Sequence, residues 1–158
     1  MAVALDDLDL QIVDALVRDG RTPAAQIAED IGLSRPAVAD RIEKLERQGV
    51  IRGTTAVVEP QALGRNVTAF VAARGPKLSS AAMKKFKELM QLDEILEVHT
   101  VAGDDCFFIK VRTDSIPTLN TLVSRLAEAP LSLSTRTTIV METHCEKVGG
   151  VMLVEARR

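Results

Sequence analysis

Basic side chains gather in one short segment of the chain. Between Ser34 and Gly53 there are five arginines or lysines against three acidic residues. A guanidinium in the first turn of a helix can hydrogen-bond a guanine edge twice, and neighbouring basic groups can neutralise phosphates. That chemistry needs only a local basic face, so the net charge of −2 does not exclude it.

The residues around this segment predict three helices. Apolar residues recur at helical spacing from Leu5 to Val17, with aspartates at the start. Thr22-Pro23 predicts a hydroxyl cap followed by proline at the first position of a second helix. Gly32-Leu33-Ser34 then predicts a tight turn and a cap for a third helix, ending near Gln48. This is the pattern of a helix-turn-helix, whose third helix would lie in the major groove of DNA.

The third helix should present two distinct faces. Val38, Ile42 and Leu45 are expected to point to the core, and Arg35 to read a base from the first turn. The full set expected to contact DNA is Thr22, Ser34, Arg35, Pro36, Ala37, Asp40, Arg41, Lys44, Arg47, Arg52 and Thr54. Of these, the basic residues after Arg35 better suit phosphates; they are Arg41, Lys44, Arg47 and Arg52.

Two short runs around Gly53, Val50–Arg52 and Thr54–Val58, predict a β-hairpin that would form a wing against the DNA backbone. The alternative for the whole module is a helical bundle whose charged face is merely solvated. Three carboxylates favour that alternative, because they repel phosphate unless they pair with arginines or meet cytosine amino groups; they are Asp40, Glu43 and Glu46.

The spacing of apolar residues changes after a linker around Pro60 and Gly64. Strands and helices then follow in the order β-α-β-β-α-β, at 66–74, 79–92, 95–102, 106–112, 116–127 and 133–143. The predicted fold class is α+β, with an N-terminal winged helix-turn-helix and a C-terminal ferredoxin-like domain. The expected division is 1–58 for the first domain, 59–65 for the linker, 66–145 for the second domain and 146–158 for a tail. Within the tail, Val148–Glu155 is a possible edge strand.

A four-stranded sheet of this kind has helices on one face only, so its other face must find cover. Apolar residues for the two faces are expected to be Val67, Ala69, Val71, Val101, Ile109, Val111, Ile139 and Met141. The pattern predicts a homodimer built through the C-terminal domain, which would hold two recognition helices about one turn of DNA apart.

Composition excludes several other classes. The chain has no Trp or Tyr, which argues against stacking on single-stranded nucleic acid. It has two cysteines and no long apolar run, so neither a disulfide framework nor a membrane span is expected, and a cytoplasmic protein fits. His99, His144, Cys106 and Cys145 lack the paired spacing of a zinc site. With no phosphate-binding loop or catalytic pairing, neither a metal, nor a cofactor, nor an enzyme is expected.

Three stretches resemble the Lrp/AsnC (feast/famine) family of prokaryotic regulators: Asp6–Asp9, Ile27–Ser34 and Arg41–Ile51, followed by a matching Pro60–Gly64. The combined pattern is specific and covers nearly the whole chain up to about Thr143. The resemblance implies a winged helix-turn-helix followed by a ligand-sensing ferredoxin-like domain. It also implies dimers that often assemble four to a ring, as octamers, with amino acids as the usual effectors.

The stretch from Thr100 to Val111 resembles the family's turn between the second and third sensor strands, which lines an effector pocket between dimers. The residues expected at this site are Thr100, Val101, Ala102, Gly103, Asp104, Asp105, Cys106, Thr135 and Thr137. Glycine lets backbone N–H groups approach a carboxylate, and Asp104 can pair with an α-ammonium group. Thr135 and Thr137 offer hydroxyls on one strand face, while Arg136 should point to the other.

The sequence departs from the family at this turn, because Asp105-Cys106 stands where an aromatic residue followed by aspartate is frequent. A plain β-turn without a ligand is therefore an open alternative.

These observations predict a sequence-specific regulator of transcription that binds double-stranded DNA and responds to a small molecule, such as an amino acid. One alternative is a haem-pathway decarboxylase with a degenerate helix-turn-helix, which two histidines fit poorly. Another is an architectural DNA-binding protein without an effector.

Overall fold

The computed structural model describes residues 3–147. Residues 3–57 form one compact unit, and Val58–Cys145 form a second. The predicted edge strand Val148–Glu155 lies outside the described residues. No helix among residues 3–147 is long and apolar enough to cross a membrane.

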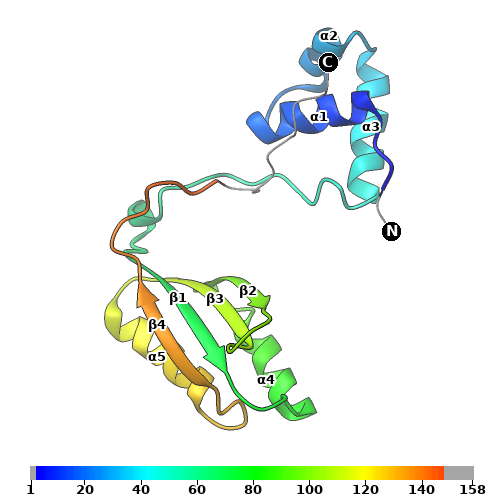
Figure 1. The fold of residues 1–158 in the computed structure, drawn as a ribbon. Helices are drawn as coiled ribbons and strands as arrows, with labels where there is room; N and C mark the ends of the chain where they lie inside the picture. Colours follow the sequence, from blue (N-terminus) through cyan, green and yellow to red (C-terminus); the bar gives the residue numbers. More distant parts are fainter. Residues whose placement is uncertain (1–2, 148–158) are drawn as a thin grey trace. The chain divides into compact units, whose positions relative to one another are not determined.

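The first unit contains three helices, α1 (Asp7–Arg18), α2 (Ala24–Ile31) and α3 (Arg35–Arg47) (Figure 1). Their core is small and apolar, and consists of Ile12, Ile27, Ala28, Val38 and Leu45. Helix α1 begins with a capping box, in which Asp6 accepts from the N–H of Asp9 and the Asp9 carboxylate accepts from the N–H of Asp6.

The predicted cap at Thr22 is wrong. Helix α2 begins at Ala24, its N-cap is Pro23, and no side chain caps it. The Thr22 hydroxyl instead donates to the Asp19 carbonyl at 2.8 Å. Thr22 lies one residue too early to cap α2, and its side chain stabilises the turn after α1.

The predicted hairpin around Gly53 is also wrong, because residues 51–59 contain no strand in the described structure. The N–H groups of Val50 and Ile51 both donate to the Leu45 carbonyl, at 2.9 and 3.2 Å. They close the end of α3 and so cannot pair with Thr54–Val58. An isolated two-stranded hairpin is marginal in water, and residues 3–57 contain no strand that could support one.

The second unit opens with a 3-10 helix, η1 (Pro60–Leu63), which lies within the predicted linker. The remaining elements are β1 (Val67–Arg74), α4 (Ser80–Leu89), β2 (Ile95–Thr100), β3 (Phe107–Thr113), α5 (Ile116–Ala127) and β4 (Ser134–Ile139). The sheet order is β2-β3-β1-β4 with every pair antiparallel. This confirms the predicted ferredoxin-like order of elements.

Helices α4 and α5 cover one face of this sheet (Figure 1). Val67, Ala69 and Val71 on β1 lie opposite Thr113, Val111 and Ile109 on β3, so these apolar residues share the covered face. The prediction that this apolar set would serve both faces is wrong. Alternation along the strands gives Val67, Ala69, Val71, Ile109 and Val111 to the helix-covered face. Val101 lies in the loop after β2, and Met141 lies beyond β4 and is 96% exposed. The uncovered face instead carries Phe70 and Phe108 among polar side chains.

Candidate nucleic-acid interface and effector loop

The turn between α2 and α3 has the geometry predicted for a helix-turn-helix. Gly32 ends α2 in the left-handed conformation, with φ of 71°. Leu33 is half-buried against the three-helix core, and its N–H donates to the Ala28 carbonyl at 2.9 Å. The Ser34 hydroxyl accepts from the Ala37 N–H at 3.4 Å and caps α3. The turn therefore sets the angle at which α3 leaves α2.

Helix α3 presents the two predicted faces. Val38 and Leu45 are fully buried, and Ile42 is half-buried between them. The side chains on the opposite side are exposed; they are Pro36, Asp40, Glu43 and Arg47. A helix held by one apolar stripe can offer its other side to a groove.

Most of the charges on α3 are paired within the unit. Arg47 pairs with Glu43 one turn earlier. Arg41 pairs with Asp6 and Asp9 of α1, and the Lys44 Nζ lies 3.6 Å from Asp9 Oδ2. Sequence reasoning missed Asp6 and Asp9, treating them only as partners of the helix dipole. Their pairing with α3 depends on how the helices cross, and no spacing along the chain reveals it.

The Asp6–Arg41 contact affects the titration of both groups. The hydrogen bond from the Asp9 backbone, followed by that from Arg41, lowers the pKa of Asp6. The hydrogen bonds that Asp6 and Asp9 accept raise the pKa of Arg41 in turn. Both shifts favour the ionised forms, so this contact is a salt bridge at neutral pH.

Arg35 differs from the other basic residues of α3. It is exposed in the first turn, and it makes no ion pair with any described residue. Arg52 and Thr54 are exposed in the segment without regular structure after α3. The structure thus leaves Arg35 as the cation on α3 with no competing carboxylate in residues 3–147.

In the second unit, the loop between β2 and β3 spans residues 101–106 and is closed by its own backbone. The Val101 N–H donates to the Cys106 carbonyl at 3.0 Å, and the Cys106 N–H donates to Ala73 of β1 at 2.9 Å. Gly103 has a φ of 133°, which strongly favours glycine, and Asp104 beside it is exposed. The loop is therefore anchored at both ends and presents its middle residues to solvent.

The two neighbouring carboxylates of this loop differ. Asp105 Oδ2 accepts from Arg136 Nη2 on β4 at 3.1 Å, whereas Asp104 makes no ion pair within the described part of the chain. Thr135 and Thr137 lie opposite Ala73 and Val71, on the face that the helices cover. Arg136 of β4 thus contacts this loop, although the sequence had placed its side chain on the opposite face from the expected site.

Among residues 3–147, neither cysteine has a partner that suggests metal or redox chemistry. The Cys106 thiol is half-buried and lies 3.6 Å from the Gly75 carbonyl, and Cys145 is exposed. Within residues 3–147, no three histidine, cysteine or acidic side chains cluster as metal ligands would.

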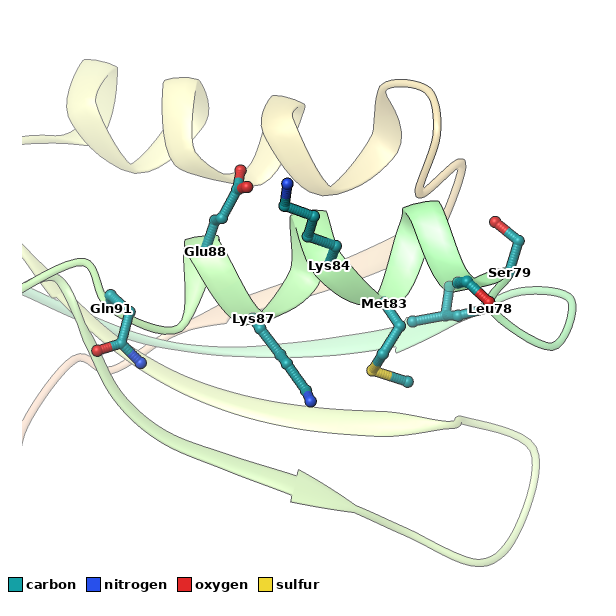
Figure 2. A pocket seen from close by; sticks show the side chains of 8 residues that line it. Leu78, Ser79, Met83, Lys84, Lys87, Glu88 and Gln91 are labelled. Carbon is teal, nitrogen blue, oxygen red and sulfur yellow. The ribbon is translucent and has the colours of Figure 1, made fainter.

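A shallow groove runs along α4, away from the predicted effector residues. Figure 2 shows Met83 and Lys87 extending to one side of the helix, and Lys84 and Glu88 to the other. The groove is lined by Leu78, Ser79, Ser80, Met83, Lys84, Lys87, Glu88 and Gln91. No residue predicted for effector binding lines it.

Comparison with known proteins agrees with this geometry. Residues 5–46 match the AsnC-type helix-turn-helix domain, and residues 68–149 match the Lrp/AsnC ligand-binding domain. The chain belongs to the Lrp/AsnC family. Its curated relatives in this family are transcriptional regulators.

Among these Lrp/AsnC relatives, the HTH-type transcriptional regulator FL11 of Pyrococcus abyssi is 35% identical over 150 residues, covering 92% of this chain and 95% of that protein. The leucine-responsive regulatory protein of Escherichia coli is 34% identical over 143 residues, covering 87% of this chain and 85% of its own.

A solved structure of a feast or famine regulatory protein from M. tuberculosis, complexed with L-methionine, superposes with a TM-score of 0.84. It is 31% identical, and the match covers 96% of this chain and 100% of that one.

Proposed function

We propose that this protein is a sequence-specific DNA-binding regulator of transcription whose assembly or DNA affinity responds to an amino acid. The observation that carries the DNA-binding part is the exposed first turn of α3, where Arg35 has no ion pair within the described residues. An arginine there can make the bidentate contact to guanine on which major-groove reading depends. As a regulator of transcription, it would act in the cytoplasm on double-stranded DNA.

Apart from Arg41, the remaining predicted DNA contacts fall into three groups. Ser34, Pro36 and Ala37 lie beside Arg35 in the first turn, and Asp40 lies one turn further on the exposed side. We propose that Lys44, Arg47, Arg52 and Thr54 contact phosphates. Lys44 and Arg47 would each exchange a carboxylate partner for a phosphate oxygen. Thr22 belongs to the turn after α1 and would contact the backbone only.

The amino-acid part is supported by the family's ligand-binding domain and by the β2–β3 loop. Relatives include a leucine-responsive protein and one crystallised with L-methionine. In this chain, Asp104 is the loop carboxylate left to pair with an α-ammonium group, since Arg136 already engages Asp105. The backbone at Gly103 is open for a carboxylate, because nothing lies within 4 Å of where a Cβ would stand.

Assembly is the third part of the proposal. The uncovered face of the sheet exposes Phe70 by 40% and Phe108 by 39%, close to charged and polar neighbours. We propose that two copies pack these faces together as a homodimer, and that dimers join further, up to an octamer. A ligand bound between dimers can then act only through its different affinity for the alternative assemblies.

Two measurements test the proposal. A mobility-shift titration with the DNA upstream of the protein's own gene, against a scrambled duplex of equal length, should show tighter and salt-sensitive binding to the former. In a thermal-shift screen of the common amino acids, at least one of them should raise the melting temperature in a concentration-dependent way. Equal affinity for both duplexes would refute sequence-specific binding, and a flat screen would favour an effector-independent DNA-binding protein.

A further inference from the structure

One carboxylate in the first unit is almost completely buried. Asp9, in the first turn of α1, is 1% exposed, although it lies in a helix whose other aspartates are solvated or half-solvated. A buried carboxylate is strongly unfavourable unless it is paired and hydrogen-bonded. Its partners are therefore part of what holds this unit together.

The partners of Asp9 come from the middle of α3. Arg41 Nη1 donates to Asp9 Oδ1 at 2.6 Å and to Asp6 Oδ2 at 2.8 Å, and the Arg41 side chain is only 27% exposed. Lys44 is more distant, at 3.6 Å from Asp9 Oδ2, and is 45% exposed. The same guanidinium thus ties both carboxylates of the α1 capping box to α3.

The position of Arg41 on α3 means that its hydrogen bonds to Asp6 and Asp9 can fix the rotation of the helix about its axis. Arg41 lies three residues after Val38 and four before Leu45, on the edge of the stripe that packs into the core. Apolar contacts are non-directional and tolerate some rotation of a helix about its axis. A short hydrogen bond to a fixed carboxylate does not, because it weakens steeply when the donor angle changes.

We infer that Asp9 and Arg41 are positioning residues for the recognition helix, and that Arg41 sets the rotation of α3 rather than binding a phosphate. The inference rests on the proposed DNA-binding function. A phosphate that took Arg41 would leave Asp9 buried without its closest partner, which is the costly outcome. Lys44, less buried and further from Asp9, keeps the phosphate role.

The test compares isosteric or near-isosteric changes on the two sides of the bridge. Asp9→Asn removes a charge that would itself repel DNA, so a phosphate-contact model predicts equal or tighter binding. The positioning model predicts that Asp9→Asn and Arg41→Met each weaken binding to the upstream duplex by roughly 3- to 30-fold. The double variant should be little worse than either single one, since both remove the same contact.

The salt dependence separates positioning from phosphate contact. Lys44→Met should reduce the slope of log K against log salt by about one, whereas Arg41→Met should leave the slope unchanged. Asp14→Asn is the matched control, because it removes the exposed Arg18–Asp14 pair of the same helix and should leave affinity within about twofold. A drop of about one in the slope for Arg41→Met, with tighter binding by Asp9→Asn, would overturn the inference.

A second measurement does not depend on DNA. Amide hydrogen exchange in the free, full-length protein should quicken along α3 in both Asp9→Asn and Arg41→Met, and Arg41→Lys should restore part of the protection. Unchanged exchange along α3 would also overturn the inference. A wild-type protein that binds no duplex, but whose α3 exchange responds to both variants, would count against the proposed function and not against the tie between α1 and α3.

Discussion

The two units of this protein use charge in opposite ways. In the first unit, Arg41, Lys44 and Arg47 of α3 form ion pairs with carboxylates of the same unit. Arg35, at the start of the helix, forms no ion pair with any described residue. In the second unit, the helix-covered face of the sheet is mainly apolar, while its uncovered face mixes Phe70 and Phe108 with charged groups such as Lys110 and Glu97.

The difference indicates which unit is complete by itself. The helical unit satisfies its buried carboxylate internally, and the described residues contain no buried side-chain polar atom without a hydrogen bond. The sheet buries one face and leaves two phenylalanines in solvent on the other. On the proposed function, the contacts to bases come from the first unit alone, whereas the second unit would be completed by another copy of the chain.

The largest expected effect comes from the uncovered sheet face. Phe70→Glu should break sheet-to-sheet packing, because a carboxylate pair would face itself across a two-fold interface. We expect a dimer-to-monomer change in light scattering and a loss of DNA affinity of at least about 100-fold, since two half-sites can no longer be read together.

Met83→Glu is the matched control, because Met83 is exposed by 38% on α4, close to the 40% of Phe70, but outside this face. A Phe70→Glu protein that stays dimeric would show that the uncovered face is not where the subunits meet.

The next largest effect should come from Arg35. Arg35→Ala should lose about 1–3 kcal/mol of discrimination between the preferred and the scrambled duplex while leaving the oligomer intact. Competition binding with single base-pair substitutions in the upstream site measures it. Arg52→Ala, at an exposed position after α3, should instead weaken all duplexes alike. The division between base reading and phosphate contact would fail if both variants relaxed base preference equally.

An effect of about 1.5 kcal/mol is expected at the β2–β3 loop, the scale of one hydrogen bond to a charged group. Asp104→Asn should weaken the binding of the amino acid that gives the strongest thermal shift by that amount. The melting temperature of the ligand-free protein should not change. Asp105→Asn breaks the pair with Arg136 and should lower the ligand-free melting temperature slightly. An unchanged titration curve for Asp104→Asn would remove this carboxylate from the ammonium site.

The smallest expected effect is a loss of stability of the first unit at acid pH. The pKa of Asp6 is lowered from its ordinary 3.8, chiefly by the Asp9 backbone hydrogen bond and by Arg41. Because the folded-state pKa is depressed, the stabilisation is fully present well above pH 3.8. It is lost as the pH falls toward and through the folded-state pKa.

Thermal unfolding of the first unit at pH 6 and pH 3.5 should therefore differ less in Asp6→Asn than in the wild type. Asp7→Asn, which removes an exposed neighbour with no ion pair in the described residues, is the control. The sheet offers a parallel case, since hydrogen bonds from His99 and Lys110 lower the pKa of Glu97 and give the same sign of pH dependence.

Some parts of the structure followed from local pattern. The αL stop at Gly32, the cap at Ser34 and the buried stripe Val38–Leu45 depend on residues within two helical turns of each other, and all three predictions are confirmed. The βαββαβ order is confirmed for the same reason. The hairpin prediction failed at Val50 and Ile51. These residues have high strand propensity, but their N–H groups donate to the Leu45 carbonyl at the end of α3. Propensity does not reveal that competition.

The sequence by itself determined the three helices, the order of the sheet elements and the family. These depend on periodicity and on short-range capping, which are written in consecutive residues. Only the tertiary structure decided that Asp9 is buried under Arg41, that Arg136 of β4 pairs with Asp105 of the β2–β3 loop, and that Val67, Val71 and Val111 share the covered face. Each of these is a contact between elements far apart in the chain, and hydrogen bonds and burial across elements depend on the crossing of helices and the register of strands.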